Sequence, residues 1–340
     1  MSPTIKDIAK RVGVSHSTVS RALSGSTLIA PETTNRIRLA AAEMGYQASA
    51  AARSLKTKRS RVLGVIVSSM DDPFFAEILQ GIEDTAQASG YSLFIASSQR
   101  DPERGQKVAR SMMEHRADGV IICSTSFSTE QSQQLQDGGF PVVVINNQAA
   151  ENFRYSIYHD DVDGARQITR HLIDLGHRRI AYLGDSLSGR TSLDRLTGFQ
   201  TEMAAANLVV PPDYIFEVPG GTPELGASSV NHFLDLPVRP TAIVCFNDML
   251  AIGLLKALQQ ADLEIPADIS ITGFDNIRFS TYTNPPLTTF DQPKRFIGLE
   301  ATRLLLDLLR MENTSGGSEI KILKGRLLIR KSTAAPNESV

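Results

Sequence analysis

The pattern of hydrophobic and polar positions divides the chain at about residue 62. Beyond that point, short apolar runs alternate with longer segments of helical period, which is typical of parallel strands that helices cover on both faces. The expected strands span residues 63–68, 92–96, 119–123, 142–146, 179–183, 215–218, 242–246 and 270–274. The expected helices include 74–89, 103–117, 164–175 and 250–261, followed by a helix at 298–311 and a last strand at 320–330.

Eight such strand and helix units are too many for one compact sheet, and the pattern starts again near Asp160. A domain buries one sheet between layers of helices, so the pattern favours two Rossmann-like halves, each with a parallel sheet. The fold class that we expect for this part of the chain is therefore α/β.

Before residue 62 the pattern predicts short helices only. Thr4, followed by Asp7 three residues later, forms a helix start, and Gly13 ends that helix. Ser15 is placed to cap a second helix, and Pro31, which suits a first helical turn, begins a third that runs to about residue 45. Only Gly-Val-Ser separates the first two helices, which is the turn expected of a helix-turn-helix.

The charge distribution changes how this helical segment is interpreted. The whole chain has a formal net charge of −2, but residues 1–61 hold eleven Lys or Arg against three acids, a net charge of +8, which leaves −10 for the remainder. Clustered cations bind phosphates and release counterions, so a basic head on an acidic body indicates nucleic-acid binding. A membrane surface is the weaker alternative, because no aromatic-bearing amphipathic helix accompanies the charge.

The second helix of a helix-turn-helix enters the major groove of DNA, and its first residues meet the base edges. Here those residues are His16, Ser17, Ser20 and Arg21, and all four can form hydrogen bonds. The head is thus predicted to read DNA, the alternative being a small helical domain whose charges only interact with solvent.

Composition and motifs exclude several classes of protein. With 41% hydrophobic and 21% charged residues the composition is globular, and the length suggests two or three domains. No apolar run reaches the roughly 18 residues of a membrane span, and the first residues are too charged for a secretory signal, so we expect a cytoplasmic protein. Cys123 and Cys245 lie in separate apolar runs and are expected to be buried free thiols. No nucleotide-binding, zinc-protease or serine-hydrolase motif occurs, so we expect neither an enzyme nor a cofactor or metal site.

Two segments carry a resemblance to a known family. TIKDIAKRVGVSHSTVSRALSG at residues 4–25 and YQASAAARSLKTKRS at 46–60 resemble the DNA-binding domain and hinge of the lactose and galactose repressor (LacI/GalR) family of bacterial transcription regulators. The resemblance implies that the residues matching His16, Ser17 and Arg21 contact bases. The full set of DNA-binding residues that it implies is Thr4, Ser15, His16, Ser17, Thr18, Ser20, Arg21, Ser24, Ala50, Ala51, Arg53, Leu55 and Lys56.

The same resemblance implies that residues 50–56 form a hinge helix on operator DNA and that Leu55 enters the minor groove. An apolar wedge between base steps costs a few kcal/mol of unstacking, which the contacts of the bent DNA offset. Packing of Leu55 beneath the next domain is the alternative. Two positions depart from the family: Ala30 stands where serine or threonine is common before the third helix, and Ser24 stands where asparagine is common.

A small-molecule site is predicted at the strand ends of the body. In doubly wound sheets, ligands bind beyond the carboxyl ends of the strands, and amides, carboxylates, arginines and phenylalanines gather at those ends here. Such a set suits a sugar, whose hydroxyls pair with the polar groups and whose apolar face packs on an aromatic ring. DDPFF at 71–75, SLDRLTGF at 192–199, FND at 246–248 and GFDN at 273–276 resemble the family's effector motifs. The candidate effector residues are Ser69, Asp72, Phe74, Phe75, Asn146, Asp160, Arg190, Ser192, Arg195, Asn247 and Asp275.

The resemblance assigns individual roles to several of these residues. By the resemblance, Arg195, Asn247 and Asp275 are the principal hydroxyl partners. Asn146 stands where many sugar-responsive members carry aspartate. Gly221 stands where purine-responsive and some sugar-responsive members carry an aromatic residue, which weakens a purine interpretation. Asp160 and Asp248 precede helices, so capping is the alternative for both, and His177 is expected to have a structural role in a turn.

The resemblance implies a domain order and a mechanism. We expect a helix-turn-helix domain at 1–48, a hinge at 49–61, a periplasmic-binding-protein-like core at 62–334 and a tail at 335–340. The core's N-lobe would span 62–160 and 292–318, and its C-lobe 161–291 and 319–334.

The resemblance also implies a function. We expect a homodimer that binds double-stranded operator DNA and represses carbohydrate-utilisation genes. A mono- or disaccharide would control this repressor by moving the two lobes. The alternatives are a purine or other metabolite as effector, a sugar-binding transport receptor, and an α/β enzyme with a DNA-binding head.

Overall fold

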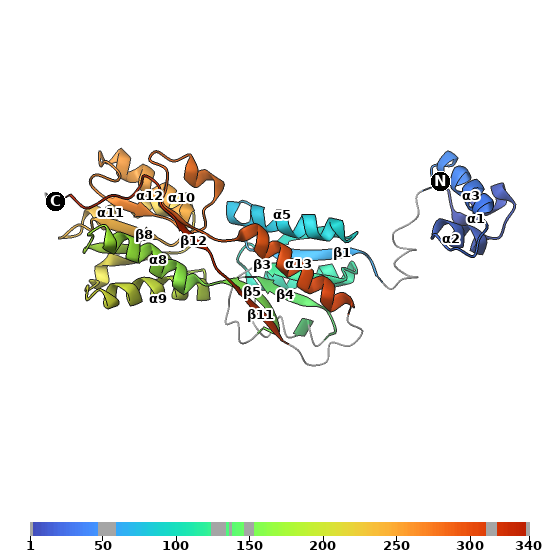
Figure 1. The fold of residues 1–340 in the computed structure, drawn as a ribbon, viewed down its shortest axis with the longest axis horizontal. Coiled ribbons are helices and arrows are strands. Elements are labelled where there is room, and N and C mark those ends of the chain that lie inside the picture. The colour runs from blue at the N-terminus through green and yellow to red at the C-terminus, as the bar shows by residue number, and fades with distance from the viewer. Residues whose placement is uncertain are drawn as a thin grey trace. The chain divides into compact units, whose positions relative to one another are not determined.

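The computed structural model describes residues 3–46, 59–123, 134–135, 138–145, 153–310 and 318–337. The chain forms two compact units, Met1–Ser60 and Arg61–Val340. Figure 1 shows the first unit as helices only and the second as two lobes in which helices cover sheets.

The first unit is a three-helix cluster consisting of α1 (Ile5–Val12), α2 (His16–Leu23) and α3 (Pro31–Glu43). The predicted helix start is present as a capping box, in which the Thr4 side chain accepts from the backbone N–H of Asp7 and the Asp7 carboxylate accepts from that of Thr4. Gly13 ends α1 with a φ of 74°, a left-handed conformation that favours glycine. These local signals produce the three-residue turn that the sequence predicts.

A small apolar core holds the three helices together. It contains Ile8 of α1, Val19 of α2 and Ile37 of α3, all fully buried, with alanines from each helix filling the gaps between them. Ala30 provides no side-chain cap to α3, as expected from its departure from the family, and Pro31 occupies the first turn instead. The first unit thus presents α2 with one apolar side against the core and one polar side to solvent.

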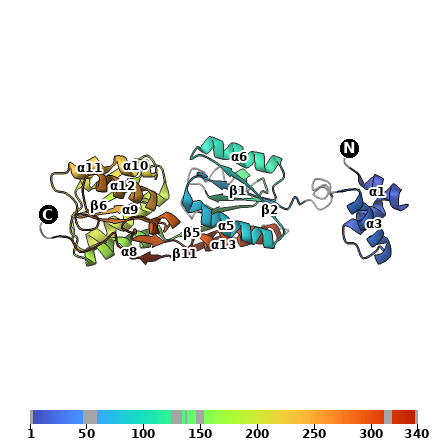
Figure 2. The same ribbon diagram turned by 90° about the horizontal axis from the view of Figure 1, so that it is seen from above.

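The first lobe of the second unit is built on a parallel sheet of six strands in the order β11-β5-β4-β3-β1-β2. Its strands are β1 (Val62–Val67), β2 (Ser92–Ser97), β3 (Gly119–Cys123), β4 (Val142–Ile145), β5 (Tyr155–His159) and β11 (Glu319–Leu323). Helices α5 (Pro73–Ala88) and α13 (Lys294–Arg310) cover one face and α6 (Pro102–Glu114) covers the other, as Figure 2 shows. Burial on both faces explains why β1, β3 and β4 are almost wholly apolar.

The second lobe has a parallel sheet in the order β7-β6-β8-β9. Its strands are β6 (Ile180–Asp185), β7 (Ile215–Val218), β8 (Ala242–Cys245) and β9 (Ser270–Thr272). Helices α8 (Asp161–Asp174) and α9 (Arg190–Ala205) pack on one face, and α10 (Pro223–Ser228), α11 (Val230–Leu234) and α12 (Asp248–Gln260) on the other. Two short helices, η2 (Pro212–Tyr214) and η3 (Arg278–Thr281), lie in connections, and β10 (Thr289–Asp291) pairs antiparallel with β12 (Arg326–Leu328).

The chain passes between the lobes three times, from β5 to α8, from β10 to α13 and from β11 to β12 (Figure 1). The sequence predicts that the chain enters the second lobe at residue 319. That boundary is wrong, because β11 pairs with β5 of the first lobe and only the residues after β11 join the second lobe. The single strand expected at 320–330 is in fact two. Gly325 lies between them, where the backbone approaches β10 so closely that a Cβ would be 2.4 Å from the Asp291 carbonyl oxygen.

The strand β5 was not predicted, because YSIYH mixes aromatic and polar residues and does not form an apolar run. It nevertheless lies inside the first sheet, between β4 and β11. Ser156 and His159 are buried within it. The position of β5 matters for function, because the residue after it, Asp160, begins the first crossing between the lobes.

Candidate functional site

The polar side of α2 carries the predicted DNA-reading residues. His16, Ser17 and Arg21 are exposed and Ser20 is half-buried, and their spacing places all four on one side of the helix. The opposite side is fixed by buried Val19 and Ala22. The first unit therefore presents a polar, basic helix face of the kind that enters a major groove.

Four other predicted DNA-binding residues also stabilise the helix ends. The Ser15 hydroxyl accepts from the Thr18 backbone N–H at 3.1 Å and lies 2.8 Å from the Thr18 hydroxyl. Thr4 donates from its hydroxyl to the Asp7 carboxylate, and Ser24 donates to the Arg21 carbonyl at 3.0 Å. Thr4, Ser15 and Ser24 remain exposed, so contact with a phosphate stays a prediction for them. The hinge residues Ala50, Ala51, Arg53, Leu55 and Lys56, and the effector candidate Asn146, lie outside the described residues.

A cleft that is open to solvent lies between the two lobes. Arg100 and the residues that follow β1 form one side of it, and residues at the ends of β6, β8 and β9 form the other. The lining residues are Ser68, Asp72, Phe74, Phe75, Arg100, Ser188, Thr191, Arg195, Phe246, Asn247 and Asp275. Six of the predicted effector residues are thus brought together: Asp72, Phe74, Phe75, Arg195, Asn247 and Asp275.

Arg195 is the centre of the polar network in this cleft, although it is only 5% exposed. Its Nε donates to the Asp161 carboxylate at 2.8 Å, its Nη1 to the Phe246 carbonyl at 2.5 Å, and its Nη2 to the Asp275 carboxylate at 3.2 Å. The guanidinium lies between two aromatic rings, 4.5 Å from the centroid of Phe246 and 3.8 Å from that of Phe274. A planar guanidinium held this way has a fixed orientation, which a flexible lysine would not reproduce.

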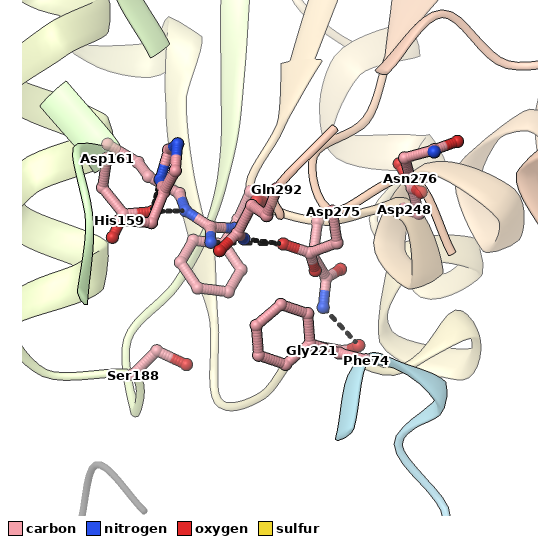
Figure 3. Close-up of polar contacts among 12 residues, drawn as sticks. Phe74, His159, Asp161, Ser188, Gly221, Asp248, Asp275, Asn276 and Gln292 are labelled. Atoms are coloured by element: carbon pink, nitrogen blue, oxygen red, sulfur yellow. Dashed lines mark hydrogen bonds and ion pairs between the residues drawn. The ribbon is translucent and has the colours of Figure 1, made fainter. Parts of the chain in front are cut away.

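Asp275 is held in place from several directions (Figure 3). Its carboxylate accepts from Gln292 at 2.6 Å as well as from Arg195, and its φ of 107° lies in a region that residues with a side chain rarely adopt. The buried Lys294 ammonium donates to the carbonyls of Asp275 and Asn276, which stabilises this backbone. Burial raises the pKa of Asp275 to about 6, in spite of the opposing effect of Arg195. A ligand hydroxyl that donates a hydrogen bond to this carboxylate would stabilise its charged form.

The pKa of the neighbouring Asp161 is shifted in the opposite direction. Burial alone would raise it, but the Arg195 guanidinium and His159 lower it below the usual value. Asp161 therefore acts as the permanent counter-ion of Arg195, while Asp275 faces the cleft.

Two cleft residues are also helix caps. Asp72 caps α5 by accepting from the Phe74 backbone N–H at 3.0 Å, and burial raises its pKa. Asn247 caps α12 by accepting from the Leu250 backbone N–H at 2.8 Å, while its amide donates to the Gly221 carbonyl at 3.1 Å. The caps fix the orientation of both side chains before any ligand arrives.

Gly221 is glycine because Asn247 packs against it. A Cβ at this position would lie 2.5 Å from the Asn247 amide nitrogen and 3.4 Å from an oxygen of Asp185. The sequence interpretation treated Gly221 only as a missing aromatic wall. The structure shows a close approach that no side chain fits without moving Asn247.

Four predicted effector residues do not line the cleft, because each is engaged in local structure. Ser69 donates to the Asp71 carboxylate, Asp160 caps α8, Arg190 pairs with Asp194, and Ser192 donates to the Asp185 carbonyl. For Asp160 the structure therefore supports the alternative that was left open, namely capping.

Asp248 does not cap α12, because Asn247 does. Instead, Asp248 is fully buried and accepts from the Ile277 backbone and the Thr289 hydroxyl, and burial raises its pKa well above the usual value. His177 has the structural role expected of it, bonding to Thr241, Ser270 and the Ala334 carbonyl.

Five cleft residues were not in the predicted set: Ser68, Arg100, Ser188, Thr191 and Phe246. Arg100 lies just beyond the carboxyl end of β2 and pairs with Asp185 of the second lobe at 3.3 Å. The signal that could have found Arg100 is its place beyond a strand end, where doubly wound sheets bind ligands.

Cys123 and Cys245 are buried and free, as predicted. Across the described ranges, no group of three or more His, Cys, Asp or Glu is placed to hold a metal ion. In the same ranges, no helix has the length and apolarity of a membrane span.

Comparison with known proteins decides the family. The model for periplasmic binding proteins and the sugar-binding domain of the LacI family matches residues 60–331, and the model for bacterial regulatory proteins of the lacI family matches residues 4–49. The chain belongs to the LacI family. Membership confirms the sequence prediction of a helix-turn-helix head on a periplasmic-binding-protein-like core, and it places the chain among transcription regulators rather than enzymes.

Individual LacI-family members agree with this placement. The chain is 34% identical over 98% of its length, and 99% of the relative's, to a protein of Actinobacillus pleuropneumoniae serotype 3 named HTH-type transcriptional repressor PurR. It is 36% identical, over 90% of its length and 92% of the relative's, to a protein of the same name from Aliivibrio salmonicida.

Solved structures support the same fold. The lac repressor dimer bound to operator and the anti-inducer ONPF matches with a TM-score of 0.89 at 26% identity, over 98% of this chain and all of that one. A LacI-family regulator from Enterococcus faecium with bound ribose matches with a TM-score of 0.71 at 28% identity, over 81% of this chain and 99% of that one.

Proposed function

We propose that this chain is a homodimeric transcriptional repressor of carbohydrate-utilisation genes whose operator affinity is controlled by a sugar bound in the cleft between the lobes. The observation that carries the proposal is that Arg195, Asp275 and Asn247 line one cleft together with Phe74 and Phe75. Carboxylate, amide and guanidinium groups held in fixed orientations suit the adjacent hydroxyls of a sugar, and an aromatic ring suits its apolar face.

A purine is the alternative effector, favoured by the similarity to repressors named PurR. Two features of the cleft favour a sugar instead. A planar base gains most from stacking on two faces, but the Gly221 side of the cleft cannot carry a ring without displacing Asn247. The Phe246 ring is covered by the Arg195 guanidinium, so part of its face is not available to a base.

The proposed mechanism uses the three connections between the lobes. A ligand that contacts residues of both lobes stabilises one relative arrangement of them, and the difference in its affinity for the two arrangements is the coupling free energy. The resemblance implies that this movement changes the hinge at residues 50–56 and thereby the affinity of His16, Ser17 and Arg21 for the operator. Two heads in a dimer read two half-sites of a pseudo-palindrome.

A thermal-shift screen of the full chain tests the choice of effector. Ribose, glucose, galactose and cellobiose are compared with adenine, guanine and hypoxanthine. A ligand at a hundredfold excess over its Kd stabilises the folded state by about 2.7 kcal/mol, which raises the melting temperature by several degrees. The proposal predicts that at least one sugar raises it and that no base does. A rise with a base alone would contradict the sugar assignment and support the purine alternative.

A further inference from the structure

The charges around the cleft point to a property of its ligand. Two arginines line it, and both already have carboxylate partners. Arg100 pairs with Asp185 at 3.3 Å, and Arg195 pairs with Asp161 at 2.8 Å and Asp275 at 3.2 Å. Because these pairs are wholly or largely buried, an incoming anion would have to break one of them to gain a cation.

Carboxylates outnumber cations in this network. The two arginines contact three carboxylates, and Asp72 adds a fourth that lines the cleft. Lys294 lies behind Asp275, but its ammonium donates to backbone carbonyls and lies 3.6 Å from Glu77 and 3.8 Å from Asp291. Among the described residues, these carboxylates therefore outnumber the neighbouring cations even when Lys294 is included.

Among the described residues, Asp72 is the cleft carboxylate that forms no ion pair, although the charges of Arg100 and Arg195 act on it at longer range. One oxygen accepts from the Phe74 backbone N–H, and among the described residues no lysine or arginine lies within 4.0 Å of the carboxylate. Its position at the start of α5 gives it partial compensation from the helix dipole, but no full counter-charge. An added negative group in the cleft would be repelled by the Asp72 carboxylate.

We propose that the cleft selects uncharged sugars over sugar phosphates and sugar acids, and that Asp72 is the residue that sets this selectivity. The inference rests on the proposed sugar-binding function and narrows the ligand class. Two like charges about 5 Å apart in an environment of effective dielectric constant about 20 repel enough to weaken binding by roughly 100-fold or more. We expect a phosphorylated sugar to bind at least that much more weakly than its uncharged parent.

Matched pairs of sugars test the proposal on the full chain. Dissociation constants are measured by calorimetry, in a phosphate-free buffer, for ribose and ribose 5-phosphate, glucose and glucose 6-phosphate, and glucose and glucuronate. The expected result is that, in every pair whose uncharged member binds, the charged member binds at least about 100-fold more weakly. A charged member that binds as tightly as its parent, or more tightly, overturns the proposal but leaves the sugar-binding function intact.

Two single substitutions, each of which removes one carboxylate charge, identify the residue that sets the selectivity. Asp72→Asn removes the charge but keeps a residue that caps helices well. The Kd of the charged sugar divided by the Kd of its uncharged parent should therefore fall at least about tenfold in each pair. Asp71→Asn is the control, because Asp71 is exposed, bonds to Ser69 and lies outside the cleft, so the ratio should not change. An equal fall in both variants, or in neither, removes Asp72 from the proposed role. Binding of nucleobases alone contradicts the sugar-binding function itself.

Discussion

The contact between Gly221 and Asn247 leads to a specific prediction about stability. In Gly221→Ala the new methyl group would lie 2.5 Å from the Asn247 amide nitrogen, a separation at which the amide must move. The amide is held by two hydrogen bonds, one to the Gly221 carbonyl and one that caps α12 at Leu250. The substitution therefore displaces a side chain that stabilises both a helix and the cleft.

The magnitude follows from those two interactions. Loss of an N-cap costs about 1 kcal/mol, and loss of a buried hydrogen bond costs about as much again, so Gly221→Ala should lower the free energy of unfolding by about 2 kcal/mol. Asn247→Ala should cost a similar amount, because it removes the same two bonds. Asn247→Ala removes the two nearest contacts of a methyl group at 221, and the next atom is an Asp185 carboxylate oxygen at 3.4 Å.

Urea unfolding of the two single variants and the double variant distinguishes the explanations. If Gly221→Ala acts by displacing Asn247, the double variant will be about as stable as Asn247→Ala alone, and the coupling free energy will be about 2 kcal/mol. Additive losses in the double variant would refute this reasoning and show that Gly221 is needed for another cause.

Three further predictions concern the head, the connection between the lobes and pH. Arg21→Ala should lose discrimination between operator and random DNA in fluorescence anisotropy with an unchanged melting temperature, whereas an equal loss on both DNAs would make Arg21 a phosphate contact only. Lys294→Met, which removes a fully buried donor to Asp275 and Asn276, should lower the free energy of unfolding by about 3 kcal/mol in urea, and an unchanged midpoint would contradict that role. The pKa of Asp275 is raised from 3.8 to about 6 in the folded state. Between these two pH values the folded state keeps a proton that the unfolded state has released, so the free energy of unfolding falls as pH rises through this range. The stability of the native chain relative to Asp275→Asn should therefore decrease by about 1 kcal/mol between pH 5 and 7, and a constant difference would contradict the raised pKa.

The parts of the fold that sequence patterns predict are those set by local chemistry. The capping box at Thr4 and the left-handed Gly13 determine the turn before α2, and apolar runs mark the strands that are buried on both faces. β5 lacks such a run, and the break at Gly325 depends on the close approach of β10, so neither could be recognised without tertiary contacts.

The candidate site shows the same limit. Asp72, Arg195, Asn247 and Asp275 reach the cleft because they follow strands, which a strand-end rule anticipates. Ser192 and Arg190 also follow a strand, but the first turn of α9 directs them to Asp185 and Asp194 instead. Side-chain direction within a helical turn and the partner that a polar group finds are set by packing, which a single sequence does not reveal.

The proposed regulation depends on coupling between the cleft and the operator-binding head. Its most direct test measures the Kd of the full chain for an operator selected from random DNA, with and without the sugar that raises the melting temperature, supplied at a hundredfold excess over its own Kd. If the two sites are coupled, saturating sugar should change the operator Kd by about 5- to 150-fold, and bound operator should change the Kd for the sugar by the same factor. An operator Kd that is the same with and without saturating sugar would show that the cleft and the head are not coupled.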